Sequence, residues 1–467
     1  MRARAVVLSL TLFALAAVPS AVAGPRVATV AGATVAGATV TGPPGKWTRI
    51  TDTNLRNIDE VGLARTSDGI LHVVWPAEVG PLDKAVMHTA ISPDGTAGTA
   101  TTVATGLHSL RNPDVVVEPS GGLRAFFGAT TGANETDGIR TATAGSDGAS
   151  WTAQGPRASN SKQPDDVGAA VTSSGTPIFA WAISFSLYVH SGINSATADL
   201  DLREETECCD YDPDLATDAT TGETFVAWYS NADGERGTWV QQVAPTQGPK
   251  TFVPGSADNG DAIHPLNRVQ IAARIGGPGV FVAYCGEYPT CERARIWEIG
   301  SDKPMTVGRG ADVESVGVSA GPGGRLWIFW QDGAVIKAAR SNPAATKTGA
   351  IVKVKPPKGT DSLWRVGGEG SLGPLDLFAH VSTGSSLATW HTQVLPRLTL
   401  RCSGGKVVGC TVSDAGDPVA GAKVKIGGKT LTSNAKGKVS VNLPPGTFVA
   451  KATKGGYTST STRVKSK

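Results

Sequence analysis

The chain has 467 residues, of which 40% are hydrophobic and 18% are charged, and its formal net charge is +3 at neutral pH. This composition is typical of a globular protein and excludes an intrinsically disordered chain, which would hold fewer hydrophobic residues. With 58 glycines and 29 prolines, the sequence favours a fold rich in turns, and its length leaves room for more than one domain.

The first 23 residues have the layout of a secretory signal peptide. The basic start Met1–Arg4 precedes the apolar run AVVLSLTLFALAAV, and the small residues Ala21 and Ala23 form a cleavage site. We therefore expect a secreted, extracellular protein in which residues 24–45 form a flexible spacer. No later apolar stretch approaches the ~18 residues of a membrane-spanning helix, so we expect no transmembrane segment.

Residues 46–396 repeat one phrase about every 50 residues. Each copy has a polar, mostly acidic start, an alternating strand, a glycine turn and a second strand. The second strands end at Trp75, Phe127, Trp181, Trp228, Tyr284, Trp330 and His380. Spacings of 46 to 56 residues are typical of four-stranded propeller blades. We predict an all-β fold with a seven-bladed β-propeller; six blades plus an irregular seventh segment are the alternative.

The ends of the repeat region predict how the ring closes. The last copy has room for only three strands, at about residues 363–394, and an unpaired strand at Trp47–Ile50 precedes the first copy. We expect this N-terminal strand to complete the final blade, because closure removes a sheet edge that would otherwise promote aggregation.

Polar residues recur at the starts of the predicted inner strands. They include Asp59, Arg111, Asp114, Asp166, Arg268, Asp312 and Arg365. If these strands are innermost in their blades, the repeat brings the side chains together at one mouth of the central channel. Convergent polar groups in a concave mouth predict a ligand site. The alternative is that the acidic residues cap hairpins and keep the ring soluble.

Three aspartates, Asp210, Asp212 and Asp214, alternate in the segment CDYDPDLATD. Alternation along a strand would place the three carboxylates on one side. Carboxylate oxygens are ligands of Ca²⁺, so we predict a calcium site, with a solvated acidic loop as the alternative. We expect no other cofactor, and the seven histidines lack the paired spacing of a catalytic zinc site.

The six cysteines of a chain with an export signal predict disulfide bonds. They fall into three neighbouring pairs: Cys208 and Cys209, Cys285 and Cys291, and Cys402 and Cys410. The second pair would close a short loop, and the third would hold the start of the C-terminal module. The first pair forms a vicinal disulfide or pairs elsewhere, and a strained vicinal ring would mark a ligand site or merely stiffen a loop.

Residues 397–467 read as short alternating strands between glycine and proline turns, which predicts a small β-sandwich. The succession D-x-G-x-P-V-x-G-A-x-V, then L-P-P-G-T-F and G-Y, resembles the carboxypeptidase regulatory-like (transthyretin-like) family. This resemblance implies an accessory domain without catalytic residues. The segment has 13 basic and two acidic residues, whereas residues 46–396 have 27 basic and 38 acidic ones. We expect the basic tail to engage anionic wall polymers or the acidic ring, and no nucleic acid as ligand of the ring.

Two motifs in the repeats resemble the sialidase-like propellers (BNR repeat proteins). Arg111-Asn-Pro113 before DVVVEPSGGLRAFF is similar to the R-I-P start of that family, and Gly145–Trp151, GSDGASW, is similar to a degenerate Asp box. The resemblance implies that Arg111 binds a ligand carboxylate, but the family's nucleophile pair and catalytic aspartate have no match. We predict a carbohydrate-binding or cell-envelope interaction protein rather than an enzyme, with a sialidase-like glycoside hydrolase as the alternative.

Overall fold

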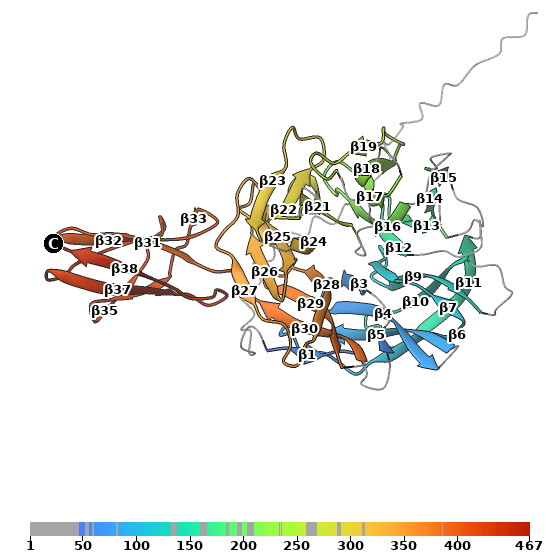
Figure 1. Cartoon of the computed structure of the whole chain (residues 1–467), viewed down its shortest axis with the longest axis horizontal. Helices are drawn as coiled ribbons and strands as arrows, with labels where there is room; N and C mark the ends of the chain where they lie inside the picture. Colours follow the sequence, from blue (N-terminus) through green and yellow to red (C-terminus); the bar gives the residue numbers. More distant parts are fainter. Residues whose placement is uncertain are drawn as a thin grey trace, which may run out of the picture. The chain divides into compact units, whose positions relative to one another are not determined.

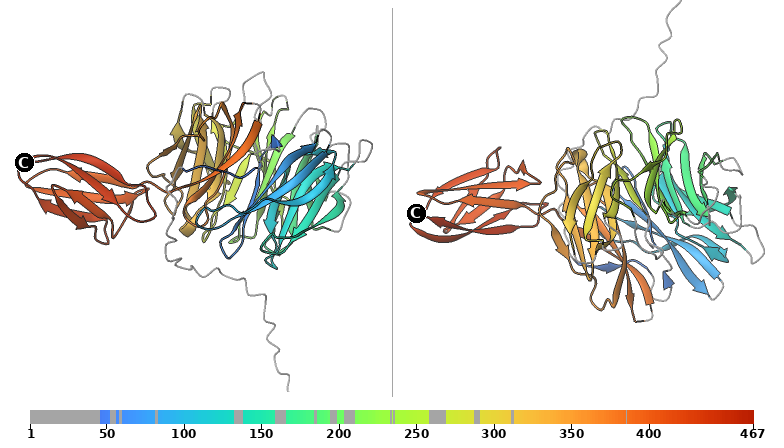
Figure 2. Two further views of the ribbon diagram at one scale, coloured as in Figure 1. Left: turned by 90° about the horizontal axis from the view of Figure 1, so that it is seen from below. Right: turned by 45° about the horizontal axis from the view of Figure 1, so that its top comes forward.

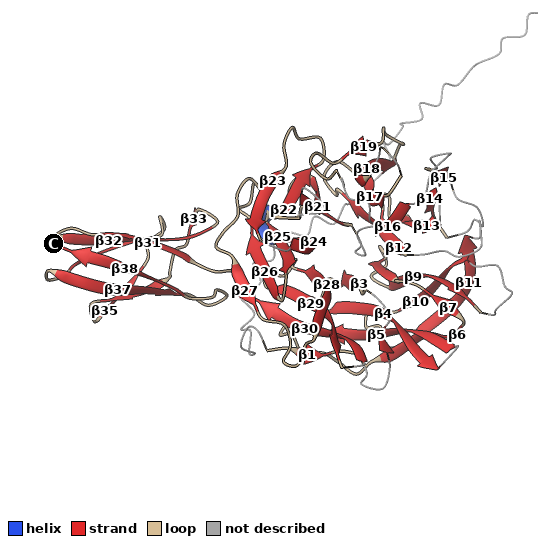
Figure 3. Ribbon diagram, in the orientation of Figure 1, coloured by secondary structure: helices blue, strands red, loops and turns tan. Residues whose placement is uncertain are grey.

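The computed structural model describes residues 46–467 except 52–55, 58–59, 81–82, 132–137, 159–165, 184–185, 194–198, 203–209, 233, 235, 258–268, 287–290, 311–312 and 385. The predicted signal peptide and spacer lie outside these residues. The described secondary structure is almost entirely β (Figure 3), with one helical turn, η1 (Pro322–Gly324). In the described part of the chain, no helix has the length and hydrophobicity that crossing a membrane requires.

Seven antiparallel sheets of four or five strands follow one another along the described residues up to Val394 (Figure 1). The first three comprise β2 (Arg56–Asn57), β3 (Gly62–Arg65), β4 (Leu71–Gly80), β5 (Asp83–Ile91) and β6 (Thr101–Leu107); β7 (Ser109–Leu110), β8 (Asp114–Val117), β9 (Leu123–Thr130), β10 (Gly138–Ala144) and β11 (Trp151–Ala158); and β12 (Val167–Val171), β13 (Pro177–Ile183), β14 (Ser186–Ser191) and β15 (Leu200–Asp201). The next three comprise β16 (Asp210–Thr217), β17 (Thr224–Ser230), β18 (Gly237–Ala244) and β19 (Thr251–Phe252); β20 (Gln270–Ala273), β21 (Val280–Gly286), β22 (Arg293–Glu298) and β23 (Met305–Arg309); and β24 (Val313–Ala320), β25 (Leu326–Asp332), β26 (Val335–Arg340) and β27 (Val352–Val354).

The last of these sheets joins the two ends of the repeat region. It contains β28 (Ser362–Glu369), β29 (Leu375–Thr383), β30 (Ser386–Val394) and the N-terminal β1 (Thr48–Arg49). Strand β1 pairs with β30, with Thr48 opposite His391 and Arg49 opposite Trp390. This pairing confirms the predicted closure by the N-terminal strand.

The sheets form a β-propeller, because their innermost strands contact one another in a closed order. This order is β3, β8, β12, β16, β20, β24, β28 and again β3. Figure 2 gives two further views of these sheets. The aromatic residue that ends each repeat lies in the second strand of its sheet and packs against a neighbouring sheet. Phe127 packs in one cluster with Val74, for example, and Trp330 with Phe281. Each such fully buried side chain contributes roughly 1.5–3 kcal/mol to stability.

Residues from Thr399 to Ser466 form a β-sandwich of two four-stranded sheets. One sheet contains β31 (Thr399–Ser403), β32 (Val407–Asp414), β33 (Asp417–Pro418) and β36 (Lys438–Asn442), and the other contains β34 (Lys423–Ile426), β35 (Lys429–Thr432), β37 (Gly446–Thr453) and β38 (Thr460–Ser466). Alternate valines, leucines and alanines of both sheets meet in one core. This strict alternation of buried and exposed residues is the pattern that the sequence predicts.

Two predicted disulfides are present. Cys285 and Cys291 are bonded with their Cα atoms 5.3 Å apart, and Cys402 and Cys410 with theirs 4.1 Å apart. The second bond joins the facing strands β31 and β32. Cys208 and Cys209, the predicted vicinal pair, lie outside the described residues.

Candidate functional site

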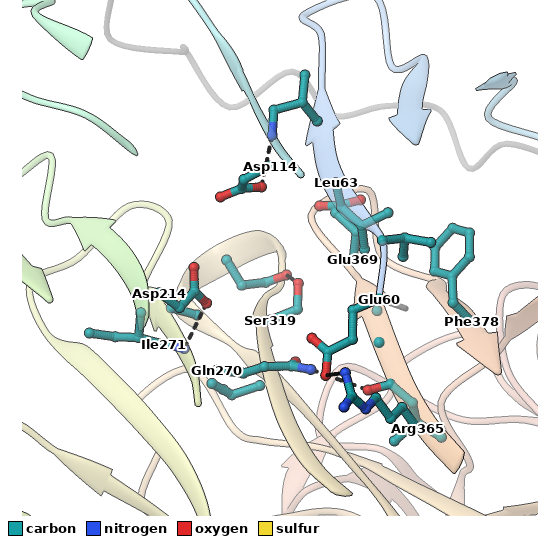
Figure 4. Close-up of a pocket in the computed structure, with 18 of the residues that line it drawn as sticks. Glu60, Leu63, Asp114, Asp214, Gln270, Ile271, Ser319, Arg365, Glu369 and Phe378 are labelled. Atoms are coloured by element: carbon teal, nitrogen blue, oxygen red, sulfur yellow. Dashed lines mark hydrogen bonds and ion pairs between the residues drawn. The ribbon is translucent and has the colours of Figure 1, made fainter. Parts of the chain in front are cut away.

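The innermost strands surround a cavity of about 230 Å³ at the centre of the propeller. Its lining mixes apolar side chains with polar ones, among them Glu60, Asp114, Asp214, Gln270, Arg365 and His380. Figure 4 shows most of these polar side chains, with Glu60 and Arg365 pointing toward each other. The repeat therefore does bring polar residues from the starts of several strands to one concave site.

Glycine and a polar residue lie side by side at one level of this lining. The pairs are Gly62 with Asp114, Gly168 with Asp214, and Gly317 with Gln270. A Cβ atom on either of the first two glycines would lie 2.7 Å from the Cα atom of the neighbouring aspartate, which is closer than Cβ atoms approach other atoms in proteins. Glycine is therefore required here so that neighbouring inner strands can approach each other.

The aspartates at this level bind the backbone of the next sheet. Asp114 Oδ2 accepts a hydrogen bond of 2.7 Å from Ala169 N, and Asp214 Oδ2 accepts one of 3.3 Å from Ile271 N. Their Oδ1 atoms also accept from the next residue of their own strand, Val115 N at 2.8 Å and Leu215 N at 2.9 Å. Each aspartate therefore joins its own strand to the neighbouring sheet, a structural role of the kind that the alternative interpretation proposes. Asp114, predicted as a ligand residue, has this structural role.

Five residues from five neighbouring sheets form a chain of polar contacts, which we call the mouth chain. In order they are Asp212, Asp166, Asn112, Glu60 and Arg365. The side chains of Asp212 and Asp166 are hydrogen bonded to each other. Asn112 N donates to Asp166 Oδ1 at 3.1 Å, and Glu60 N donates to Asn112 Oδ1 at 2.7 Å. Arg365 Nη1 completes the chain with an ion pair to Glu60 Oε1 at 3.1 Å.

The carboxyl of Asp212 is buried in this chain beside a second carboxyl, that of Asp166. Its burial, and then the charge and hydrogen bond of Asp166, raise the pKa of the Asp212 carboxyl well above its ordinary value; Glu60 raises it further and Arg365 opposes the shift. The backbone of Asp212 has φ of 49° at a β-bulge between Tyr211 and Asp214. Aspartate tolerates this left-handed conformation better than most residues. A carboxyl with a raised pKa keeps its proton to a higher pH than a free one, and the protonated form can donate a hydrogen bond to a neighbouring carboxylate.

His380 lines the cavity beside Arg365 and is 7% exposed. Burial, and then the charge of Arg365, lower the pKa of His380 to about 4, so its ring is neutral at neutral pH. Neither ring nitrogen has a hydrogen-bond partner among the described residues. A buried polar group left in this state costs about 1–3 kcal/mol, which a ligand hydroxyl would offset.

The predicted ligand residues have different fates. Asp166 and Arg365 belong to the mouth chain, and Arg111 is exposed directly before Asn112. Asp59, Arg268 and Asp312 lie outside the described residues. The prediction missed Asn112 and His380; the signal for His380 was a histidine where the other repeats end in an aromatic residue.

Asp212 and Asp214, two of the three aspartates of the predicted calcium site, do not share one side of the strand in the way alternation suggests. The β-bulge between Tyr211 and Asp214 interrupts the alternation, so Asp212 meets Asp166 while Asp214 meets the backbone of Ile271. The side chain of Asp210 lies outside the description. Among the described side chains, no group of three or more His, Cys, Asp or Glu could hold a metal ion.

Comparison with known proteins yields structural likenesses only. No protein-family model matches the sequence, and no curated protein matches it. Similar solved structures include a protein of unknown function from Dyadobacter fermentans DSM 18053 (7% identity, TM-score 0.47, 75% of this chain and 98% of that one) and the GH93 α-L-arabinofuranosidase of Fusarium graminearum (12%, 0.42, 74% and 96%). A third is the polysaccharide lyase Uly1 (10%, 0.41, 71% and 89%). Likenesses this weak carry no argument about the ligand or the chemistry.

Proposed function

We propose that the mouth of the propeller binds carbohydrate, in a secreted protein that acts outside the cell or at its envelope. The observation that carries the proposal is the neutral, unpartnered His380 in a cavity beside the Glu60–Arg365 ion pair. A neutral imidazole offers one donor and one acceptor, and a sugar hydroxyl needs both. At about 230 Å³, the cavity is smaller than most drug-sized ligand pockets, which favours one sugar unit of a longer glycan.

The charge of the lining favours a neutral sugar in the cavity. Carboxylates outnumber the cations there, and Arg365 already pairs with Glu60. In the propeller, we expect an acidic group of a ligand to bind at the exposed Arg111, the residue to which the sialidase-like resemblance gives this role. The cavity and Arg111 therefore make separate contributions, and the first does not depend on the second.

A glycan-array screen of the chain, followed by affinity measurements on the best ligand, tests this proposal. His380→Phe removes both ring nitrogens and keeps an aromatic ring of similar size. We expect it to weaken binding about ten-fold or more, because one buried hydrogen bond is worth about 1.5 kcal/mol. His108→Phe, in a residue that does not line the cavity, is the matched control. Unchanged affinity of the His380 variant would refute the role of the cavity.

Arg111→Ala isolates the acidic-sugar part of the proposal. We expect it to weaken binding of acidic glycans about ten-fold or more, because a guanidinium can form a bidentate, charge-assisted pair with a carboxylate. Binding of neutral glycans and the melting temperature should stay the same. If the affinity for both classes of glycan falls together, Arg111 does not act as a carboxylate ligand.

The hydrogen bond between the buried carboxyls of Asp212 and Asp166, together with the raised pKa of Asp212, favours glycoside hydrolysis as a second candidate function, with this pair as the general acid. Two carboxyls in direct hydrogen-bond contact are closer than the ~5 Å of a retaining glycosidase, so Glu60 would have to serve as the second carboxylate. Release of reducing sugar from the glycans that bind would support it, provided that Asp212→Asn and Glu60→Gln each abolish the release. Binding without any turnover would leave only the first function.

A further inference from the structure

The outward face of one sandwich sheet is basic. Strands β34, β37 and β38 bury alternate residues in the sandwich core and expose the residues between them. The exposed cations, which we call the basic face, are Lys423, Lys425, Lys451, Arg463 and Lys465. Neighbouring strands lie about 4.8 Å apart, so these side chains form one array of positive charge.

The pairing of the strands places like charges together. Lys425 lies directly opposite Lys451 in the β34–β37 pair, and Arg463 and Lys465 follow on the next strand, opposite Val449 and Thr447. Like charges directly opposite each other destabilise a sheet. A bound anion would relieve this repulsion, so the arrangement favours anion binding even though it lowers the stability of the free protein.

The sandwich segment has few carboxylates that could neutralise this face. The sequence has no aspartate or glutamate after Asp417. The two acidic residues of the segment 397–467 pair with arginines that precede the segment. Asp417 Oδ2 accepts a hydrogen bond from Arg325 Nη2 at 2.7 Å, and Asp414 forms an ion pair with Arg340. Among the described residues, no ion pair involves a cation of the basic face.

We propose that the basic face binds an acidic polysaccharide, a linear polymer that carries carboxylate or sulfate groups. Hydroxyl groups lie between the cations, where they can bond sugar hydroxyls: Thr430, Thr432, Thr447, Thr453 and Ser461 are exposed on the same sheet. No aromatic side chain is exposed on these strands, so the face lacks the stacking platforms that single-stranded nucleic acids use. This surface is independent of the propeller mouth, and failure of either proposal leaves the other standing.

Two triple variants of the full chain with equal changes in charge test the surface. The first carries Lys425→Gln, Lys451→Gln and Arg463→Gln on the basic face. The control carries Arg401→Gln, Lys406→Gln and Lys438→Gln, which remove three exposed charges elsewhere in the sandwich. Binding to polygalacturonate, measured at low salt, should weaken at least ten-fold in the first variant and less than two-fold in the control.

Several results would overturn this proposal. Equal losses in the two variants would show that net charge alone drives binding. Tighter binding of oligo-dT than of polygalacturonate would indicate a nucleic-acid surface instead. Wild-type binding must also weaken as salt rises, because exposed charges are screened beyond about 8–10 Å at 0.1–0.15 M salt. If the melting temperature of the triple variant on the basic face falls, the single variant Lys425→Gln replaces it. This single variant should also bind polygalacturonate more weakly than the wild type.

Discussion

The propeller and the sandwich treat charged side chains in opposite ways. In the propeller, Arg65 is 6% exposed at its side chain and pairs with Glu369 and Asp376, at the seam where the last sheet meets the first. In the sandwich, cations such as Lys425 and Lys451 are exposed, and no described carboxylate pairs with them. A single buried charge has a large effect on stability, because removing its partner leaves that charge desolvated and uncompensated. Each exposed charge contributes little to stability or binding, so only several together have a measurable effect, and salt screens that effect.

Arg65→Met should have the largest effect on stability. It leaves the buried Asp376 and the partly buried Glu369 without their shared cation, and breaking a buried pair in this way costs about 3–5 kcal/mol. Urea unfolding followed by tryptophan fluorescence measures the loss. Lys353→Met, at an exposed position of β27, is the control and should change stability by less than about 0.5 kcal/mol. If Arg65→Met changes the free energy of unfolding as little as Lys353→Met does, buried charges in the propeller do not differ from exposed charges in their effect on stability.

The next largest effect concerns pH and His88, which is 2% exposed between the first two sheets. Its Nε2 lies 3.0 Å from His72 Nδ1 and its Nδ1 lies 3.2 Å from Thr101 Oγ1. Burial, and then the charge of His72, lower the pKa of His88 to about 4. The folded state therefore holds His88 neutral while the unfolded chain takes up a proton below about pH 6.5. This stabilisation is complete above pH 6.5 and is lost as pH falls toward 4, by about 3 kcal/mol.

The measurement is the free energy of unfolding at pH 7, 5.5 and 4 for the wild type and His88→Gln. The variant should lose less stability between pH 7 and pH 4, because glutamine does not titrate. Parallel curves for the two proteins would show that other groups cause the acid sensitivity.

Asp212→Asn should show the opposite pH dependence. The pKa of Asp212 is raised in the folded state, so the wild type loses stability as pH rises from about 3.8 toward that folded pKa. Asparagine keeps the hydrogen bond to Asp166, tolerates φ of 49° and does not ionise. The variant should therefore have the higher melting temperature at pH 7, with the advantage shrinking toward pH 4. Equal melting temperatures at both pH values would contradict a raised pKa of Asp212 in the folded state.

The sequence predicts the fold well because the repeat carries local information. Each copy holds its own strands, its own turn and one aromatic residue such as Trp75 or Trp330. The closure of the ring was also predictable, because the last copy lacks one strand and the N-terminal end of the repeat region has a strand without a partner. The two short-range disulfides were predictable for the same reason, since a separation of six or eight residues suffices to bring two cysteines together.

The site was less predictable because it depends on pairing between distant strands. Asp166 and Arg365 were expected at the mouth, but the contact of Asp166 with Asp212 follows from a β-bulge that no local pattern indicates. Asp114 lines the cavity as expected, but its hydrogen bond to Ala169 of the next sheet is a contact that the sequence does not indicate. His380 lacks partners only because of what surrounds it in three dimensions. The alternation of side chains along a strand, which the sequence shows, predicts which residues can come into contact. The register between paired strands, which the sequence does not show, determines which of them do.

The smallest effect tests the exposed side of the comparison. Lys425→Gln removes the charge that faces Lys451, whereas Lys423→Gln removes an equal charge that faces Thr453. Relief of direct repulsion should raise the melting temperature of the sandwich by about 1 °C for the first variant and less for the second. Screening should erase the difference at 1 M salt, where the Debye length is about 3 Å. Thermal unfolding at 0.02 M and 1 M salt separates the two variants. A lower melting temperature for Lys425→Gln at both salt concentrations would mean that this lysine stabilises the free protein, and the stability cost attributed to the basic face would be wrong.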